Sequence, residues 1–419
     1  MSETFPVDVR SEVGRLTGVI LHRPGPEVAL MTPATAERAL YSDILNRRVA
    51  AQEYAQLQGV LERWTRTFAV RDLLADILAE RSVREVLVER VCARERVPEL
   101  APSLLGLEPA ELTRALIEGV PLVRDTLTRF LSPDRFALPP LHNFFFMRDA
   151  AAALGDRVLI GRMASPVRAR EALIMDAVFT HHPQLRTETI DPVRLGADRP
   201  EVTIEGGDVL VIRDDVLLVG VGRRTSTHAV DFLLERLAGD HAVRHVFVQE
   251  LPPEPESFIH LDMAFTQLDR DLCMVYAPLI LEHNHYETVQ IRLAGGRVER
   301  IREVDSLLAG LREIGIDLAP AVCGGPADRW TQEREQWHSG TNFFALAPGK
   351  VIGYARNEHT LAELDRHGFA ILAAGDVIAG RADPDAHARC VITIDGSELA
   401  RGGGGCRCLT LPIGREAVS

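Results

Sequence analysis

The chain has 419 residues, with 47 Lys and Arg against 60 Asp and Glu, so its net charge at pH 7 is −13. Hydrophobic residues make up 46% of it, as in ordinary globular proteins. The acidity argues against a nucleic-acid partner and a polybasic membrane anchor, because both require excess positive charge. No apolar run approaches the roughly 20 residues of a membrane span, and the first residues do not resemble a signal peptide. We therefore expect a cytoplasmic protein with no nucleic-acid and no membrane partner.

Six cysteines in a chain of this length do not form a disulfide framework, and free thiols are expected in a reducing compartment. Two of them, Cys406 and Cys408, follow four consecutive glycines at 402–405. That is an unusual place for a buried structural thiol. A zinc site typically needs four ligands at recurring spacings, and no second Cys/His pair matches this one, so we predict no metal.

The first third of the chain combines a strand with a series of helices. Residues 19–21 are predicted to form a buried strand that ends before Pro24. Further on the apolar pattern becomes helical, and five side chains are expected on one helix face: Tyr54, Leu57, Leu61, Trp64 and Phe68. Ser82 with Glu85 resembles a capping box, which predicts the start of another helix. We expect residues 66–133 to form a helical insert in a main domain made of residues 1–65 and 134–419.

After residue 140 the pattern changes to β-hairpins. Four times a polar cluster precedes two apolar runs separated by a turn, which is typical of a hairpin. The last polar residues of these clusters are Asp149, Asp208, Asp262 and Asn342. A unit that recurs at intervals of tens of residues indicates a propeller-like or solenoid arrangement. We expect roughly five modules of strand pair plus helix, whose leading polar residues converge on one axis.

Each polar cluster has an ordinary structural explanation when it is taken alone. His260 and Asp262 fit a surface strand, Glu205 and Asp208 fit an acidic turn, and Asp149 fits an ion pair with its neighbouring arginine. The glycine-rich tail fits a flexible segment with incidental cysteines. If the stretch around His260 is a strand, however, the side chains of His260 and Asp262 point to the same face and reach one ligand.

Taken together with Cys408, these side chains suit a guanidine substrate. Paired carboxylates bind a guanidinium through bidentate, charge-assisted hydrogen bonds. A thiolate attacks its central carbon, and a histidine protonates the leaving amine and then deprotonates water. Cys408 is weakly ionised at its ordinary pKa, but Arg407 or a bound cationic substrate would favour the thiolate.

These residues resemble the arginine deiminase family of guanidino-group modifying enzymes. The resemblance extends over almost the whole chain, and its motifs occur in the same order. They lie at residues 11–14, 21–24, 143–149, 205–208, 224–225, 260–263, 265–266, 334–337, 340–342 and in the glycine-rich tail that ends at Cys408.

The resemblance implies an α/β fold, a five-bladed pseudo-symmetric α/β propeller with an inserted α-helical domain. It implies hydrolysis of L-arginine to L-citrulline and ammonia through an S-alkylthiouronium adduct on the cysteine, with no metal and no other cofactor. The catalytic residues would be Cys408, His260, Glu205, Asp149 and Asp262. The substrate-binding residues would be Asn143, Phe146, Arg168, Arg224 and Arg401, of which the last belongs to a mobile loop in the family.

The chain also departs from the family pattern around the pocket. His142 stands where the family has Pro, Met147 where it has Thr, Asn46 where it has Trp, and Phe343-Phe344 where it has Thr-Leu. These changes keep open a related deiminase or amidinotransferase that acts on a modified arginine or another guanidine, and a non-catalytic arginine-binding protein. A small-molecule substrate is expected in each case, and the sequence leaves a homo-oligomer open.

Overall fold

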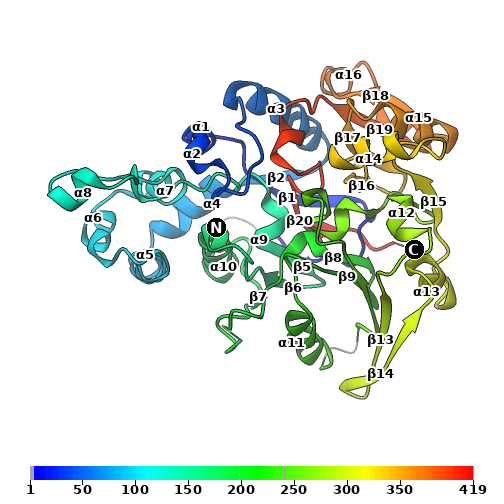
Figure 1. Ribbon diagram of the computed structural model, residues 1–419, viewed down its shortest axis with the longest axis horizontal. Coiled ribbons are helices and arrows are strands. Elements are labelled where there is room, and N and C mark those ends of the chain that lie inside the picture. The colour runs from blue at the N-terminus through cyan, green and yellow to red at the C-terminus, as the bar shows by residue number, and fades with distance from the viewer. Residues whose placement is uncertain (1–3, 198, 240–241, 419) are drawn as a thin grey trace.

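The protein is a mixed α/β structure, in a computed structural model that describes residues 4–197, 199–239 and 242–418. Within these ranges five β-sheets hold three to five strands each, and a short two-stranded ladder lies outside them. Figure 1 shows the sheets grouped in one part of the molecule and helices α5 to α8 projecting to one side. In the described ranges, no helix combines the length and apolarity needed to cross a bilayer.

The sheets share one unit, a β-hairpin followed by a helix and a third strand that runs parallel to its neighbour. The helix supplies the long connection that a parallel strand requires. The first unit after residue 140 consists of β5 (Ala151–Leu154), β6 (Arg157–Ile160), α10 (Ala169–His181) and β7 (Glu188–Ile190). The next consists of β8 (Val209–Arg213), β9 (Val216–Val221), α11 (Thr227–Leu237) and β10 (His245–Glu250).

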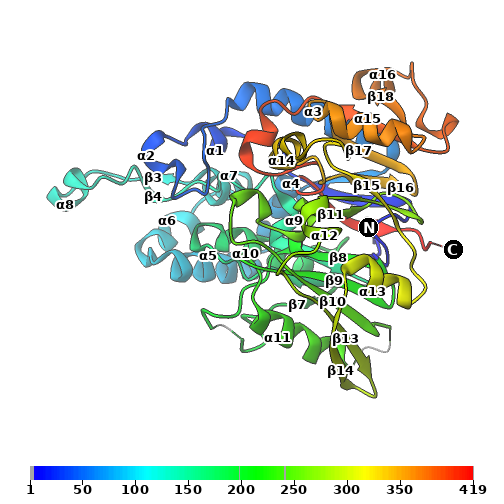
Figure 2. The ribbon, with the colours of Figure 1, turned by 45° about the vertical axis from the view of Figure 1, so that its right-hand side comes forward.

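The following two units elaborate on this plan. The third is β11 (Phe265–Gln267), β12 (Leu272–Val275) and β15 (Ala319–Val322), with α12 (Ala277–Ile280), β13 (Thr288–Ala294), β14 (Arg297–Val304) and α13 (Leu307–Glu313) between them. There β13 and β14 extend the preceding sheet, as Figure 2 shows. The fourth is β16 (Phe344–Ala347), β17 (Lys350–Tyr354), α15 (Glu358–Arg366), β18 (Ala370–Ala373), α16 (Ala374–Ile378) and β19 (Cys390–Ile394), preceded by α14 (Arg329–Trp337).

The fifth sheet joins segments from both ends of the chain. Its central strand β1 (Leu16–Leu21) pairs antiparallel with β20 (Leu411–Arg415) and parallel with β2 (Arg66–Ala69). Three helices connect β1 to β2: α1 (Pro26–Ala29), α2 (Pro33–Ala36) and α3 (Arg47–Trp64). Strand β20 therefore completes a hairpin with β1 although the two are distant in sequence.

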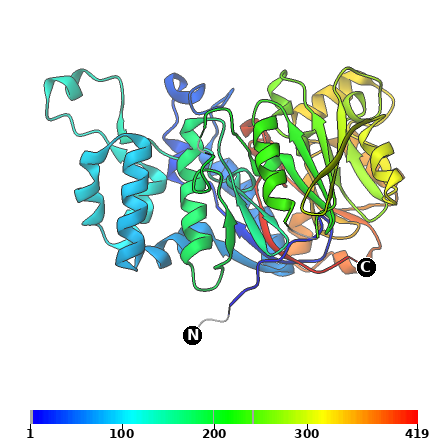
Figure 3. The same ribbon diagram turned by 90° about the horizontal axis from the view of Figure 1, so that it is seen from below.

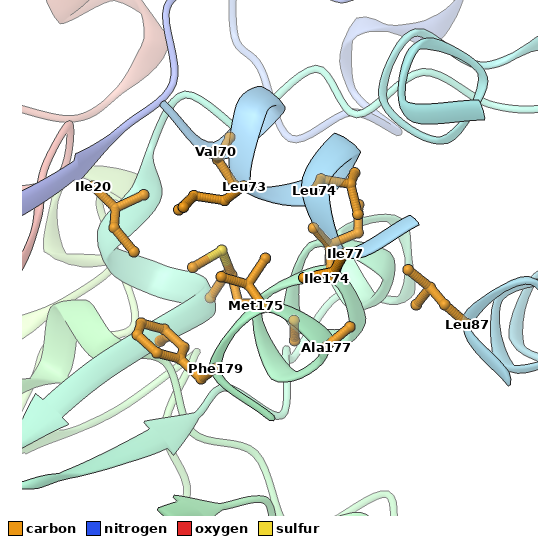
Figure 4. Close-up of a cluster of buried hydrophobic side chains, with 14 of the residues drawn as sticks. Ile20, Val70, Leu73, Leu74, Ile77, Leu87, Ile174, Met175, Ala177 and Phe179 are labelled. Atoms are coloured by element: carbon orange, nitrogen blue, oxygen red, sulfur yellow. The ribbon is translucent and has the colours of Figure 1, made fainter. Parts of the chain in front are cut away.

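A helical segment follows β2 and packs on the outer side of α10. It contains α4 (Val70–Leu78), α5 (Arg81–Glu95), α6 (Ala101–Leu105), α7 (Pro109–Glu118), β3 (Val120–Pro121), α8 (Leu127–Leu131) and β4 (Phe136–Leu138). Figure 3 shows that the α8 region extends farthest from the sheets. Leu73, Leu74 and Ile77 of α4 lie beside Ile174 and Met175 of α10 in one apolar cluster (Figure 4).

The structure confirms the strand at 19–21 and all four predicted hairpins. Two predicted helix features are wrong. Phe68 does not continue the helix of Trp64, because it lies in β2 and pairs with Ile20. Ser82 does not cap a helix, because α5 already begins one residue earlier and Glu85 binds the side chain of Arg81 at 2.7 Å.

Candidate active site

Four short segments carry the predicted catalytic side chains, and each lies directly before the first strand of a hairpin. Asp149 lies in α9 (Met147–Ala150) before β5, and Glu205 precedes η3 (Gly206–Asp208) before β8. His260 precedes η5 (Leu261–Met263), which leads into β11, so the stretch around His260 is not a strand. Cys408 lies shortly before β20, and its carbonyl accepts a hydrogen bond from the backbone N–H of Arg148 at 3.1 Å. These segments lie close together because each occupies the same position in its hairpin unit.

The imidazole of His260 lies between two carboxylates. Its Nε2 lies 3.0 Å from Oε2 of Glu205, and its Nδ1 lies 3.6 Å from Oδ1 of Asp149. All three side chains are buried. The second oxygen of Glu205 accepts a hydrogen bond from the N–H of Ala164 at 3.0 Å. Gly207 permits this packing, since a Cβ there would lie 2.5 Å from the imidazole.

These carboxylates decide the charge of the imidazole. Burial disfavours the charged form, but the negative charges of Asp149, Asp208 and Glu205 outweigh burial and raise the pKa of His260 to about 9. Burial would raise the pKa of Glu205, but the hydrogen bond from His260 and the charge of Arg224 lower that pKa. At neutral pH His260 is therefore an imidazolium and a proton donor.

The thiol of Cys408 faces a second carboxylate that the protein holds rigidly. Sγ lies 3.7 and 3.9 Å from the two oxygens of Asp262. Arg407 donates a hydrogen bond of 2.8 Å to Oδ2 of Asp262 and two hydrogen bonds of 2.9 and 3.0 Å to Glu12. The buried chain of contacts from Glu12 through Arg407 to Asp262 thus fixes the carboxylate beside the thiol of Cys408. The sequence assigned no role to Glu12, which lies in its own motif far from Arg407.

The two neighbouring thiols have different surroundings. Burial and the negative charges of Asp262 and Asp149 raise the pKa of Cys408 well above its ordinary value. Burial alone raises the pKa of Cys406, which lies in the apolar core beside β17 and β19. Only Cys408 therefore has a pKa that a bound cation at the carboxylates would lower.

Asn342 ties the nucleophile segment to that of Asp262. Its Oδ1 accepts the backbone N–H groups of Arg407 and Cys408 at 3.0 and 3.1 Å, and its Nδ2 donates to the carbonyl of Asp262 at 3.1 Å. The sequence identified Asn342 as a leading polar residue but assigned it no role. Asn342 leads into the fourth hairpin as Asp149, Asp208 and Asp262 lead into the first three, and this shared position was the signal for its role.

The glycine run lets the chain pass close to an aromatic ring. Gly403 has a φ of +87°, in the left-handed region that favours glycine. A Cβ on Gly404 would lie 2.6 Å from the ring of Phe146 and 3.0 Å from Cβ of Cys408. The ring of Phe146 therefore packs against the glycine run next to the thiol segment.

Arg168 and Asn143 make their hydrogen bonds within the protein, next to the segment of Asp149. Arg168 donates to Oδ2 of Asp149 at 2.6 Å and to Oε2 of Glu171 at 2.7 Å. The same guanidinium donates to the carbonyls of Asn143 and Phe146 at 3.4 and 3.3 Å. Asn143 donates through Nδ2 to the carbonyl of Ala39 at 2.8 Å. In this structure both side chains hold the segment that carries Asp149 and Phe146.

Arg224 and Arg401 lie elsewhere, on the wall of a cavity of about 650 Å³. Other parts of its wall come from Tyr41, Ile259 and Trp337. Nη1 of Arg224 lies 3.9 Å from Oε1 of Glu205. Arg401 donates to Glu398 at 3.1 Å and to Asp43. The cavity wall thus carries three arginines, Arg223, Arg224 and Arg401, of which Arg224 lies next to the buried Glu205.

Asp149, Glu205 and His260 are close enough for one atom of each to reach a common metal ion. Their contacts fit a metal poorly, however. The carboxylates of this group already have other partners: Oδ2 of Asp149 accepts a hydrogen bond from Arg168, and the oxygens of Glu205 contact His260 and the N–H of Ala164. Carboxylates among cations and N–H donors suit proton transfer and an organic cation.

Two solved structures share the fold at low sequence identity. SxtG, an amidinotransferase from Microseira wollei, matches with a TM-score of 0.56 at 14% identity, covering 99% of this chain and 98% of that one. The N-terminal domain of ArgZ, an arginine dihydrolase from cyanobacteria, matches with a TM-score of 0.52 at 12% identity, covering 96% and 99%. These likenesses concern the fold alone.

Sequence comparison gives a closer match. The profile of the arginine deiminase family matches residues 37–415. The chain is 31% identical over 433 residues to the arginine deiminase of Bacillus thuringiensis subsp. konkukian (strain 97-27), with 99% of each chain covered. It is 32% identical over 437 residues to that of Limosilactobacillus fermentum, again with 99% of each chain covered.

Proposed function

The chain belongs to the arginine deiminase family, and we propose that it hydrolyses L-arginine to L-citrulline and ammonia through a covalent adduct on Cys408. One observation carries the proposal. A thiol lies 3.7 Å from Asp262, and at the same buried site an imidazolium lies between Asp149 and Glu205. A nucleophile, an acid and carboxylates for a cation are the groups that this reaction requires.

The guanidinium of arginine binds between Asp149 and Asp262. Oδ1 of Asp149 has no hydrogen-bond partner among the described residues, and Oδ1 of Asp262 lies beside the thiol at 3.9 Å. Charge-assisted hydrogen bonds to a planar guanidinium would fill these acceptors. The positive charge also offsets the repulsion that keeps Cys408 protonated, so the thiol loses its proton to solvent when the substrate binds.

The thiolate then attacks the central carbon of the guanidinium and forms a C–S bond. His260 donates its proton to one amino nitrogen as the C–N bond breaks, and ammonia leaves. Cys408 now carries an S-alkylthiouronium, and His260 is neutral. Glu205 and Asp149 hold the imidazole in place for both its acidic and its basic form.

Water completes the reaction. Neutral His260 takes a proton from a water molecule, whose oxygen attacks the thiouronium carbon. The C–S bond breaks, the proton of the new hydroxyl group returns to sulfur, and L-citrulline leaves. The proton first lost by the thiol converts ammonia to ammonium in solution, so charges balance without a metal or an organic cofactor.

The amino-acid end of arginine extends toward the cavity. We assign its carboxylate to Arg224 and Arg401, which line that cavity, and its alkyl chain to the wall formed by Phe146. Arg168 and Asn143 are assigned to the same end of the substrate. Both contact protein groups in the structure, so their binding to substrate requires an exchange of partners.

Product analysis tests the proposal. Incubation with L-arginine should give citrulline and ammonia in equal amounts, whereas no citrulline at any pH from about 5 to 8 would contradict it. A parallel incubation with a primary amine distinguishes hydrolysis from amidino transfer, which would produce a new guanidine at the expense of citrulline. Nω-methylated arginines test the alternative of a modified substrate.

A second part of the proposal concerns how the five sheets are arranged. We propose that the five sheets close around one axis as a five-bladed propeller, and that residues 66–133 form the helical insert between 1–65 and 134–419. The repeated hairpin unit and the pairing of β1 with β20 support it, although the insert so defined begins with the four residues of β2. All six cysteines are unpaired, which supports a cytoplasmic location.

A further inference from the structure

A second cavity lies where the helical segment meets the loops before the active site, and we propose that it binds a small organic anion. Its volume is about 380 Å³, within the range of small-molecule sites. Its walls come from the loop after α1, the end of α5, residues 133–143 and the start of α10. Its lining includes Asn143, which is assigned above to the amino-acid end of the substrate, but among the described residues it includes neither Cys408 nor His260.

Arg170 gives this cavity a buried and incompletely bonded cation. Its side chain is 1% exposed, and its Nη2 donates to the carbonyl of Pro139. Nε and Nη1 have no hydrogen-bond partner among the described residues. Oε1 of Glu95 lies 3.5 Å from Nε and provides charge but no hydrogen bond. Unfilled donors on a buried guanidinium are costly, and an acceptor on a ligand in the cavity that Arg170 lines would reduce this cost.

Three more arginines line the same cavity: Arg38, Arg94 and Arg135. Only two acids, Glu95 and Asp134, stand against the four arginines, so the lining carries an excess of two positive charges. Arg38 lies 3.5 Å from Asp134. Neither Arg94 nor Arg135 has an ion-pair partner in the part of the chain that the structure describes. The excess of charge favours an anionic occupant.

The remaining walls determine the rest of the ligand. They are largely apolar and include Leu30, Phe136, Pro140 and Val167. A carboxylate or a phosphate monoester presents two neighbouring oxygen atoms, which a guanidinium binds in a bidentate manner. An apolar or planar body attached to that group would pack against the apolar walls. The chemistry therefore matches an organic carboxylate or phosphate better than a free inorganic ion.

Calorimetric titration tests this inference. Benzoate and phenyl phosphate are the probes, with benzamide as the uncharged counterpart of benzoate and inorganic phosphate as the anion without a body. The titrations use the full chain with Cys408→Ala in saturating L-arginine, so that the catalytic cavity is occupied. We expect saturable one-site binding of benzoate, phenyl phosphate or both, with no binding of benzamide and weaker binding of inorganic phosphate.

Variants locate the site. Arg170→Gln should weaken binding at least tenfold, and the exposed pair Arg94→Ala with Arg135→Ala should weaken it severalfold without touching a buried group. Arg114→Ala, which removes an exposed arginine of α7 outside the cavity, should leave binding unchanged. Absence of saturable binding, equal binding of benzamide, or binding that is unaffected by both the Arg170 and the Arg94/Arg135 variants would overturn the inference.

Discussion

Two regions hold their charges under different constraints: the buried cluster around Asp149 and Asp262, which we call the floor, and the cavity wall that contains Arg401, which we call the rim. On the floor, Asp149 and Asp262 are almost fully buried, and Arg168 and Arg407 bind them at 2.6 and 2.8 Å. On the rim, the side chain of Arg401 is 39% exposed and pairs with the exposed Asp43 and with the buried Glu398. A buried charge needs a fixed partner, whereas an exposed pair exchanges partners at little cost. We therefore expect changes on the floor to affect mainly kcat, and changes on the rim to affect mainly KM.

Removal of the nucleophile should have the largest effect. Cys408→Ala is expected to lower citrulline formation by about 10⁴-fold or more, because no other group on the floor can form the adduct. Cys406→Ala is the matched control and should change the rate only a few-fold, since its thiol lies in the apolar core. A steady-state assay of both variants decides the point, and equal losses would contradict the separation of the two thiols.

Loss of the proton donor comes next. His260→Gln should reduce kcat by about 10³-fold, because both the departure of ammonia and the attack of water need the imidazole. Steady-state assay of citrulline and ammonia formation measures this loss. His283→Gln, at an exposed loop position, serves as the control. A His260 variant with normal turnover would sink the assigned role.

Asp262→Asn tests the rigidity of the floor. The change keeps the shape but removes the charge that pairs with Arg407 and the substrate, so we expect kcat/KM to fall about 100-fold and the free energy of unfolding by about 3 kcal/mol. Denaturant titration and kinetics measure the two effects. If the charge of Glu12 alone is enough to stabilise Arg407, the free energy of unfolding will be unchanged. That result would contradict the role of Asp262 as a required partner of Arg407.

The floor should also make stability depend on pH. The pKa of His260 is raised from 6.5 to about 9, so the folded state holds its proton more tightly than the unfolded chain does. The resulting stabilisation, at most about 3 kcal/mol, is complete below pH 6.5 and is lost as the pH rises through about 9. Urea titrations of wild type and His260→Gln between these limits should diverge, and parallel curves would contradict the raised pKa.

The smallest effect is expected on the rim. Arg401→Ala should raise KM for arginine about tenfold and change kcat only a few-fold, because its pair with the exposed Asp43 contributes little to stability and it lies away from the reacting carbon. Arg223→Ala, a neighbouring arginine of the same cavity, is the comparison. A large loss of kcat in Arg401→Ala would place this residue with the floor instead.

Local patterns predicted the hairpins and the residues that lead into them, because a turn and alternating apolar residues depend only on neighbours in sequence. The prediction that the helix continues to Phe68 was wrong, because Phe68 pairs with Ile20 across the sheet and is therefore part of a strand. Glu12 and Arg407 illustrate the same limit at the site. Their ion pair joins residues that are 395 positions apart in sequence, so no local pattern predicts it.

The pairing of β20 with β1 has a consequence for how the enzyme becomes active during synthesis. The ribosome delivers the floor carboxylates and His260 long before it delivers Cys408 and β20. Arg407, which holds Asp262 in place, is delivered together with the nucleophile. A nascent chain therefore has no nucleophile until its last sheet can form, and the thiol and the arginine that orders its neighbouring carboxylate enter the site in one step.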